Sequence, residues 1–281
     1  MNIIDDIKKY NVLFWNCKGK DSSPNIQNCI YEIVKENEVQ IVGLCECLGG
    51  LNDILQPLQQ VDPNFSFIGE SDWLPKGGRI RIFSVLPQKL FTIKRKSNRF
   101  LSYVFLDIFD LCFVHLKSLV STTNESKTME DLSVIEKIKQ EDDREHIFKK
   151  KFIVGDFNAC PYSNSLVNSR LFNAVRYEEV GKFFFRKDHS KNDVYVNPCW
   201  ELLGRKKAAV YGTYYYKAAD YYNLGTYLFD QVIFNKDLID YYDDNSLRII
   251  NSTSNHSLIT TQGKISELYS DHLPIFFSIK G

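Results

Sequence analysis

Short apolar segments are the feature of this sequence that most limits its fold. Runs rich in Val, Ile, Leu, Phe and Tyr recur along almost the whole chain, separated by turn residues or charged stretches. Such short runs of β-branched and aromatic residues are typical of strands. We predict strands at residues 11–15, 40–44, 65–68, 79–85, 101–108, 111–115, 152–154, 227–234 and 275–279.

Two other segments have the period of a helix. Residues 26–37 repeat apolar side chains about every 3.6 positions, and residues 130–150 place a few apolar residues among many charges. Helices and strands alternate in the first half, whereas the second half is rich in strands, loops and tyrosine. No long linker, repeat or low-complexity tract divides the chain, so we predict one α/β (α+β) domain over residues 1–281 with mixed sheets.

The composition argues against several classes of protein. The 35 Lys and Arg residues balance the 35 Asp and Glu residues, so no broad basic surface for nucleic acid is predicted, although a local patch stays possible. The seven cysteines include no CxxC pair, which argues against zinc and thioredoxin-like chemistry. We expect reduced thiols in a cytoplasmic protein with no membrane partner, because there is neither a signal peptide nor a long apolar run.

Several predicted strands end in polar residues that a hydrophobic core does not require. Asn16 follows VLFW, Glu46 follows IVGLC, and His115 closes LCFVH. Asp156 and Asn158 follow the apolar run FIVG, one residue apart. A charge at such a place is costly unless it is paired or bound to a cation. These positions are therefore candidates for a functional site.

The C-terminal half adds similar residues. Asp230 interrupts the apolar run YLFDQVIF, and Asp271 and His272 directly precede LPIFFSI. Carboxylates gathered at strand ends make an oxygen-ligand site for Mg²⁺ or Mn²⁺, and a neighbouring Asp can hold a His in one tautomer. Together these groups indicate metal-assisted hydrolysis of a phosphate ester.

The motifs VLFWN, IVGLCE, FVHLKS, VGDFNACP, GTYYY, LFDQVIF and SDHLPI follow one another along almost the whole chain. In this order and spacing they resemble the endonuclease/exonuclease/phosphatase superfamily, which includes deoxyribonuclease I and the abasic-site endonucleases. The resemblance implies a four-layer αββα sandwich, in which two mixed β-sheets pack face to face and are flanked by helices. It also implies an active site at one end of the sandwich.

The resemblance implies a metal-binding role for some of these residues. Glu46 is expected to bind the divalent metal, Mg²⁺ or Mn²⁺, and Asn16 to help position the metal or the phosphate. Asp271 matches a second acid close to the metal. One departure stands out, because Lys18 occupies a position at which some branches of the superfamily carry an acid. A metal there would have fewer carboxylates within reach.

Catalytic roles follow from the same resemblance. Asp156 is expected to orient or deprotonate the attacking water, and Asn158 to donate hydrogen bonds to phosphate oxygens. His272, with Asp230 as its carboxylate partner, would stabilise the transition state or act as acid and base. His115 matches the histidine that helps to protonate the leaving oxygen in the deoxyribonuclease I-like branch.

Substrate contacts are expected from further residues. Tyr214 and Trp200 resemble aromatic groups that border the substrate groove, where they could stack on bases, with ordinary packing as the alternative. Arg81 is a candidate phosphate contact, with a solvated strand face as its alternative. Glu70 is a looser candidate to hold the far nitrogen of His115.

The leading hypothesis is a Mg²⁺- or Mn²⁺-dependent phosphodiesterase that hydrolyses DNA or RNA. One alternative is a phosphatase or phosphodiesterase acting on a small molecule or lipid, and another is an inactive binding module of the same fold. Fold alone does not decide the substrate. The sequence also leaves open endo- against exo-cleavage and the oligomeric state.

Overall fold

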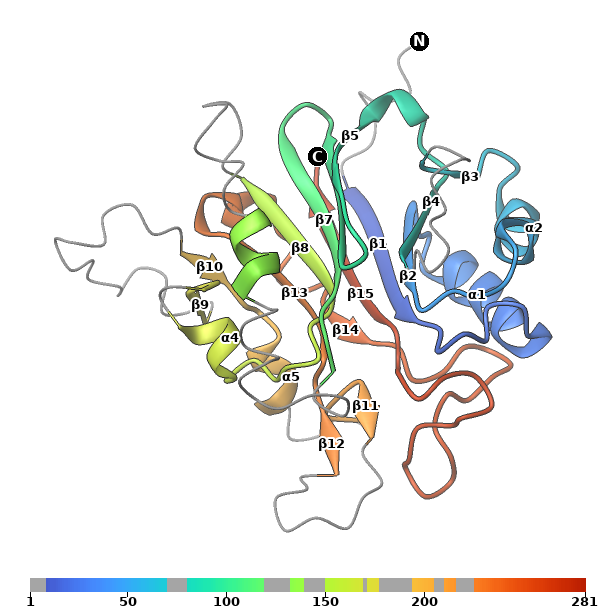
Figure 1. The fold of residues 1–281 in the computed structure, drawn as a ribbon. Coiled ribbons are helices and arrows are strands. Elements are labelled where there is room, and N and C mark those ends of the chain that lie inside the picture. Colours follow the sequence, from blue (N-terminus) through green and yellow to red (C-terminus); the bar gives the residue numbers. More distant parts are fainter. Residues whose placement is uncertain are drawn as a thin grey trace, which may run out of the picture.

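Two mixed β-sheets lie face to face in the computed structural model of this chain (Figure 1). The structure describes residues 9–69, 80–118, 132–138, 150–168, 171–176, 194–204, 210–215 and 225–281.

The first sheet has six strands, and parallel pairing within it is confined to β1 with β2. In spatial order its strands are β14 (Arg248–Ile249), β15 (Ile275–Lys280), β1 (Lys9–Asn16), β2 (Ile41–Cys45), β4 (Ile80–Ser84) and β3 (Ser66–Phe67). The last strand in the sequence, β15, thus pairs with the first, which brings the C-terminal motif beside the N-terminal one.

The second sheet has seven strands, with parallel pairing between β7 and β8 and between β10 and β9. In spatial order they are β5 (Phe91–Lys96), β6 (Phe100–Phe105), β7 (Phe109–His115), β8 (Lys151–Asp156), β13 (Asp230–Asn235), β10 (Tyr195–Val196) and β9 (Ala174–Val175). A small third sheet pairs β11 (Tyr214–Tyr215) with β12 (Thr226–Tyr227).

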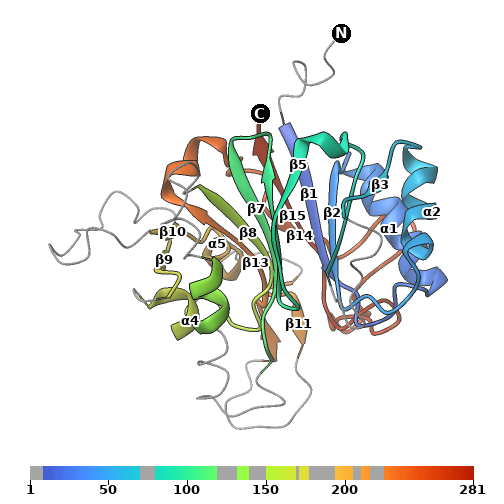
Figure 2. The same ribbon diagram turned by 45° about the horizontal axis from the view of Figure 1, so that its top comes forward.

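Helices cover the outer faces of both sheets. The helices α1 (Pro24–Glu36) and α2 (Leu51–Val61) pack on the first sheet, as Figure 2 shows. Helical residues 132–138 and α4 (Asn164–Val167) pack on the second sheet. The fold is therefore the predicted four-layer αββα sandwich. Shorter elements are α5 (Trp200–Gly204) and the 3₁₀ turns η2 (Gln88–Leu90) and η7 (Lys236–Tyr241).

The alternation of side chains along β1 explains why its sequence is apolar at nearly every position. Val12 and Phe14 point into the core between the sheets, whereas Leu13 and Trp15 point towards the helices. Where the sheets approach each other, a Cβ atom at Gly43 of β2 would lie 2.4 Å from the ring of Phe113 of β7. Glycine at this position therefore lets the aromatic ring of one sheet pack on the backbone of the other.

Each predicted strand overlaps an observed one, and α1 matches the predicted helix 26–37 to within two residues at its start. The helix α2 was not predicted, although its buried residues Ile54 and Leu58 keep the helical spacing. The predicted helix 130–150 is described only for residues 132–138. All seven cysteines are buried free thiols. Among the described residues, no helix has the length and apolar character needed to cross a membrane.

Candidate active site

The register of the second sheet places three predicted site residues side by side. His115 of β7 lies opposite Asp156 of β8, which in turn lies opposite Asp230 of β13. Asn16 closes β1 in the facing sheet and Glu46 follows β2, so both sheets contribute to the cluster. Residues far apart in the sequence thus meet at the ends of their strands.

Gly155 explains why Asp156 can occupy this position. Its φ is +156°, a conformation that favours glycine, and a Cβ atom on it would lie 1.9 Å from the carbonyl oxygen of Val114. Only glycine lets β8 approach β7 so closely. The close approach sets Asp156 beside His115.

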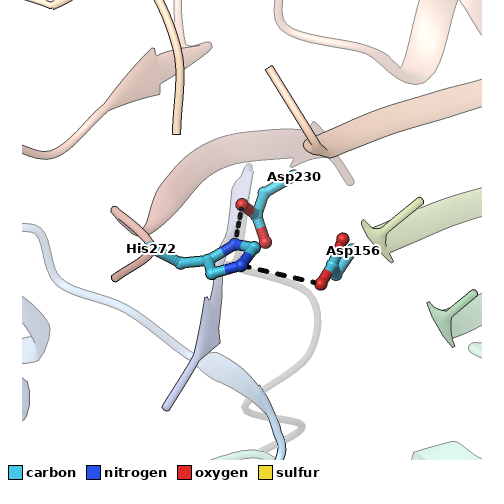
Figure 3. A group of neighbouring side chains, drawn as sticks. All are labelled: Asp156, Asp230 and His272. Carbon is cyan, nitrogen blue, oxygen red and sulfur yellow. Dashed lines mark hydrogen bonds and ion pairs between the residues drawn. The ribbon is translucent and has the colours of Figure 1, made fainter. Parts of the chain in front are cut away.

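Asp230 and His272 form a buried dyad, which Figure 3 shows. The imidazole Nδ1 lies 2.7 Å from the carboxylate Oδ2 of Asp230. Burial alone would lower the pKa of His272, but the carboxylates of Asp230 and Asp156 outweigh it and raise that pKa to about 10. Burial raises the pKa of Asp230, and the charge of His272 opposes that shift. The dyad is therefore an imidazolium–carboxylate pair at neutral pH.

Asp156 is the central residue of the cluster. Its Oδ2 accepts a hydrogen bond of 3.0 Å from Asn16 Nδ2, and its Oδ1 accepts one of 2.8 Å from the backbone N–H of Asn158. The Nε2 atoms of His272 and His115 lie 3.9 and 3.8 Å from the same Oδ2. Asp156 therefore faces both histidines, and Figure 3 shows it opposite the free edge of the His272 ring.

Phe157 separates Asp156 from Asn158 and is fully buried. Asn158 has φ +47°, and its Nδ2 donates to the carbonyl oxygen of Leu116 at 3.0 Å. Because an amide nitrogen carries two hydrogens, this bond leaves one for another acceptor. The turn after β8 therefore holds Asn158 beside Asp156 and also fixes the orientation of its amide.

Glu46 is the accessible carboxylate of the cluster, with 34% of its side chain exposed. Its Oε1 lies 3.2 Å from His115 Nε2. The hydrogen bond to His115 lowers the pKa of Glu46 to about 2 despite the opposing effect of burial, and Asn16 contributes a further hydrogen bond. Glu46 also has φ +54°, an uncommon conformation for a non-glycine residue that often marks functional sites.

His115 has its other ring nitrogen, Nδ1, buried without a hydrogen-bond partner among the described residues. Glu70, the residue expected to hold it, lies outside the described residues.

Asp271 is paired with a lysine. The ammonium of Lys18 contacts Asp271 Oδ2, and the backbone N–H of Lys18 donates to Asn16 Oδ1 at 3.0 Å. The residue that departs from the superfamily pattern is thus in direct contact with the acid expected near the metal.

The two aromatic candidates differ in their surroundings. The Tyr214 ring centroid lies 4.9 Å from that of His272 and 5.2 Å from that of Phe229, so Tyr214 borders the dyad. Trp200 begins α5, and its ring centroid lies 6.2 Å from that of Tyr162. Of these two candidates, Tyr214 has a ring contact with a residue of the cluster, and the described residues show none for Trp200.

Arg81 does not have the environment expected of a phosphate contact. It is 6% exposed, and its guanidinium binds Asp21 at 3.0 Å together with the carbonyl oxygens of Gly49 and Gly50. The alternative given for Arg81, a solvated strand face, is wrong because the side chain is buried. Sequence reasoning missed Asp21. Its carboxylate also accepts hydrogen bonds from the backbone N–H groups of Leu48 and Gly49. A lone Asp in a polar turn gives no signal of this role.

Two further polar residues, to which the sequence analysis gave no role, hydrogen-bond to the backbone of cluster residues. Ser270 donates from Oγ to the carbonyl oxygen of Asn16 at 2.6 Å, which ties the C-terminal motif to β1. The Oγ1 atom of Thr213 accepts a hydrogen bond of 3.0 Å from the backbone N–H of Asp230. Both residues lie within the quoted motifs SDHLPI and GTYYY, which is the signal that could have found them.

The architecture is shared with solved structures. Zebrafish (D. rerio) TDP2 complexed with a single-strand DNA product matches with a TM-score of 0.54 and 15% identity, covering 98% of this chain and all of that one. An AP endonuclease from Archaeoglobus fulgidus matches with a TM-score of 0.54 and 14% identity, covering 95% of this chain and 98% of that one. A D. rerio TDP2 humanized by 14 mutations matches with a TM-score of 0.52 and 13% identity, covering 98% of this chain and all of that one.

The chain has the fold of TDP2 and of this AP endonuclease. No protein-family model matches the sequence, and no curated protein matches it either. At these low identities the likeness concerns the fold, and function has to be argued from the site.

The donor set is suited to a hard cation. Asp156, Asp230 and His272 offer ligand atoms within 4.8 Å of one another, and Oδ1 of Asp230 is buried without a hydrogen-bond partner among the described residues. Glu46 adds an accessible carboxylate and Asn16 an amide oxygen. Oxygen-rich groups of this kind are preferred by Mg²⁺ and Mn²⁺. The cluster could therefore hold a divalent metal.

Proposed function

We propose that this protein is a divalent-metal-dependent phosphodiesterase of the endonuclease/exonuclease/phosphatase superfamily, formed by residues 1–281 as one domain, and that it hydrolyses nucleic acid. The observation that carries the proposal is the convergence of the Asp230–His272 dyad with Asp156 and the accessible Glu46. An inactive binding module would have no physical need for so many buried charges in one place.

The position of each residue in the cluster suggests its role in the reaction. The Nε2–H edge of the His272 imidazolium is the side not held by Asp230, so it is available to a phosphoryl oxygen as negative charge develops. Asp156 orients the attacking water or accepts its proton, and the second amide hydrogen of Asn158 binds a phosphate oxygen. His115 assists the leaving oxygen.

Glu46 and Asn16 are the residues that would hold Mg²⁺ or Mn²⁺. We favour them over the dyad because a hydrogen bond of 2.7 Å between Asp230 and His272 leaves no room for a cation between these two atoms. The positive charge of His272 also disfavours a cation at its ring. When bound, the metal supplies Lewis-acid stabilisation of phosphoryl charge.

A polynucleotide is the substrate that we propose. Tyr214 supplies an aromatic ring beside His272, and stacking on bases is tolerant of sequence. Trp200, whose ring lies against Tyr162, is the second candidate for stacking. A structural neighbour holds a single-strand DNA product. A small phosphoester is the alternative supported by the zero net charge, because a polyanion binder often shows a basic bias. A cytoplasmic location completes the proposal.

The test is a cleavage screen of the purified protein with Mg²⁺ or Mn²⁺ on single- and double-stranded DNA, RNA and simple phosphodiesters. We expect polynucleotide cleavage that EDTA abolishes and that Glu46→Gln, Asp156→Asn and His272→Gln each reduce by about 100-fold or more. His256→Gln is the matched control, because His256 pairs with Glu32 elsewhere in the fold. Turnover of small phosphoesters alone would favour the alternative, and equal rates for wild type and the three site variants would exclude an enzyme of this kind.

A further inference from the structure

We propose that Lys18, anchored by Asp271, is a substrate-binding residue that contacts the phosphate, and that Asp271 does not ligate the metal. This inference rests on the proposed phosphodiesterase function and deepens it. It also replaces the sequence-based expectation that Asp271 is a metal-proximal acid.

The ion pair joins opposite ends of the chain. The Lys18 ammonium contacts Asp271 Oδ2, and the side chains are 44% and 18% exposed. Asp271 immediately precedes His272 of the dyad. Because Asp271 is the more enclosed partner and the ammonium is the more open one, the pair presents its positive side to solvent.

The backbone of Lys18 is fixed to the same cluster. Its N–H donates to Asn16 Oδ1 at 3.0 Å, and the opposite end of that amide donates to Asp156. The N–H of Gly19 donates to the carbonyl oxygen of Glu46 at 2.7 Å. Lys18 also has φ +49°, which a non-glycine residue adopts at a cost unless the surroundings hold it. The turn is therefore a built part of the site.

Charge balance follows from this geometry. The ammonium neutralises Asp271, so a divalent cation at that carboxylate would have to displace Lys18 or bind beside its positive charge. Glu46 has no lysine or arginine contact among the described residues, and its side chain is 34% exposed, so its carboxylate is open to a cation. A metal is consequently favoured at Glu46 and disfavoured at Asp271.

The same geometry suits a phosphate. An ammonium has three donors, and Asp271 accepts from one of them, so the exposed lysine retains donors for an anion. A phosphodiester bound between Lys18 and the His272 imidazolium would meet two fixed positive charges in addition to the metal. Lys18 would therefore act on substrate affinity.

Metal binding separates this inference from its alternatives. Mn²⁺ affinity of the full-length protein can be measured by electron paramagnetic resonance for wild type, Glu46→Gln, Asp271→Asn and Lys18→Gln. We expect Glu46→Gln to weaken binding at least about tenfold, and Asp271→Asn and Lys18→Gln to change it by less than about threefold. If Asp271→Asn lost as much Mn²⁺ affinity as Glu46→Gln, this inference would be overturned and the proposed function would stand. Failure of wild type to bind Mn²⁺ would overturn the proposed function and the inference with it.

Kinetics test the phosphate contact. Lys18→Gln should raise KM about tenfold with little change in kcat, and should reduce the salt dependence of binding by about one phosphate contact. Lys18→Arg should recover most of the affinity. Lys20→Gln is the matched control, since Lys20 contacts the carbonyl oxygen of Glu267 in the neighbouring loop and should leave KM unchanged. An unaltered KM and salt slope for Lys18→Gln would refute the contact.

Discussion

His272 Nδ1 lies 2.7 Å from Asp230 Oδ2, and this contact joins the C-terminal motif to a strand of the opposite sheet. The imidazole belongs to the loop before β15 in the first sheet, whereas the carboxylate begins β13 in the second. Packing of the two sheets thus places the carboxylate that raises the pKa of the histidine.

Removal of this carboxylate should make His272 less basic. In Asp230→Asn the pKa of His272 should fall well below about 10, because the largest charge that raises it is gone while burial still favours the neutral ring. NMR titration of the ring can follow this shift. Cleavage should fall about 100-fold or more at neutral pH. A His272 pKa unchanged by the substitution would show that the dyad does not set its charge.

Gly155→Ala should destabilise the protein by more than about 2 kcal/mol. The new methyl group would collide with the carbonyl oxygen of Val114, and β8 would have to move away from β7. Thermal unfolding measures the change. Gly204→Ala at the end of α5 is the control, since among the described residues beyond its own helix no atom lies within 4 Å of the added Cβ, and the variant should melt near the wild-type temperature. Equal melting of both variants would argue against the close approach.

Arg81→Met should cost about 3 kcal/mol of stability, because it leaves the buried carboxylate of Asp21 without its ion-pair partner. Chemical denaturation gives this value. The salt dependence of substrate binding should stay as in wild type, since the guanidinium is buried and binds Asp21 and the loop after Glu46. A reduced salt slope with unchanged stability would restore the role expected from the sequence.

Glu32 should contribute stability that depends on acid. Burial alone raises its pKa, but hydrogen bonds from Thr253, Asn255 and His256 outweigh this effect and lower it from 4.5 to about 2. The depressed pKa means that the contribution is complete above pH 4.5 and is lost as the pH falls towards 2. Wild type should therefore melt above Glu32→Gln at pH 7, and the two curves should converge between pH 4.5 and 2. A gap in melting temperature that is constant over this range would contradict the linkage.

The strands and most of the site could be read from residue order, because apolar runs and polar strand ends are local patterns. Asn16, Glu46, Asp156 and Asp230 were recognised in this way, and His272 was paired with Asp230 through a family resemblance. The helix α2 was not predicted, and it contains Pro57, whose low helix propensity is outweighed by packing of Ile54 and Leu58 on the first sheet.

The sequence by itself determined which side chains can carry the chemistry and which segments form strands. Only the tertiary structure decided their partners: Lys18 with Asp271, Asn16 with Asp156, and Arg81 with Asp21. The physical reason is that a strand's composition is a local property, whereas its register and the distance between facing sheets depend on the packing of the whole core.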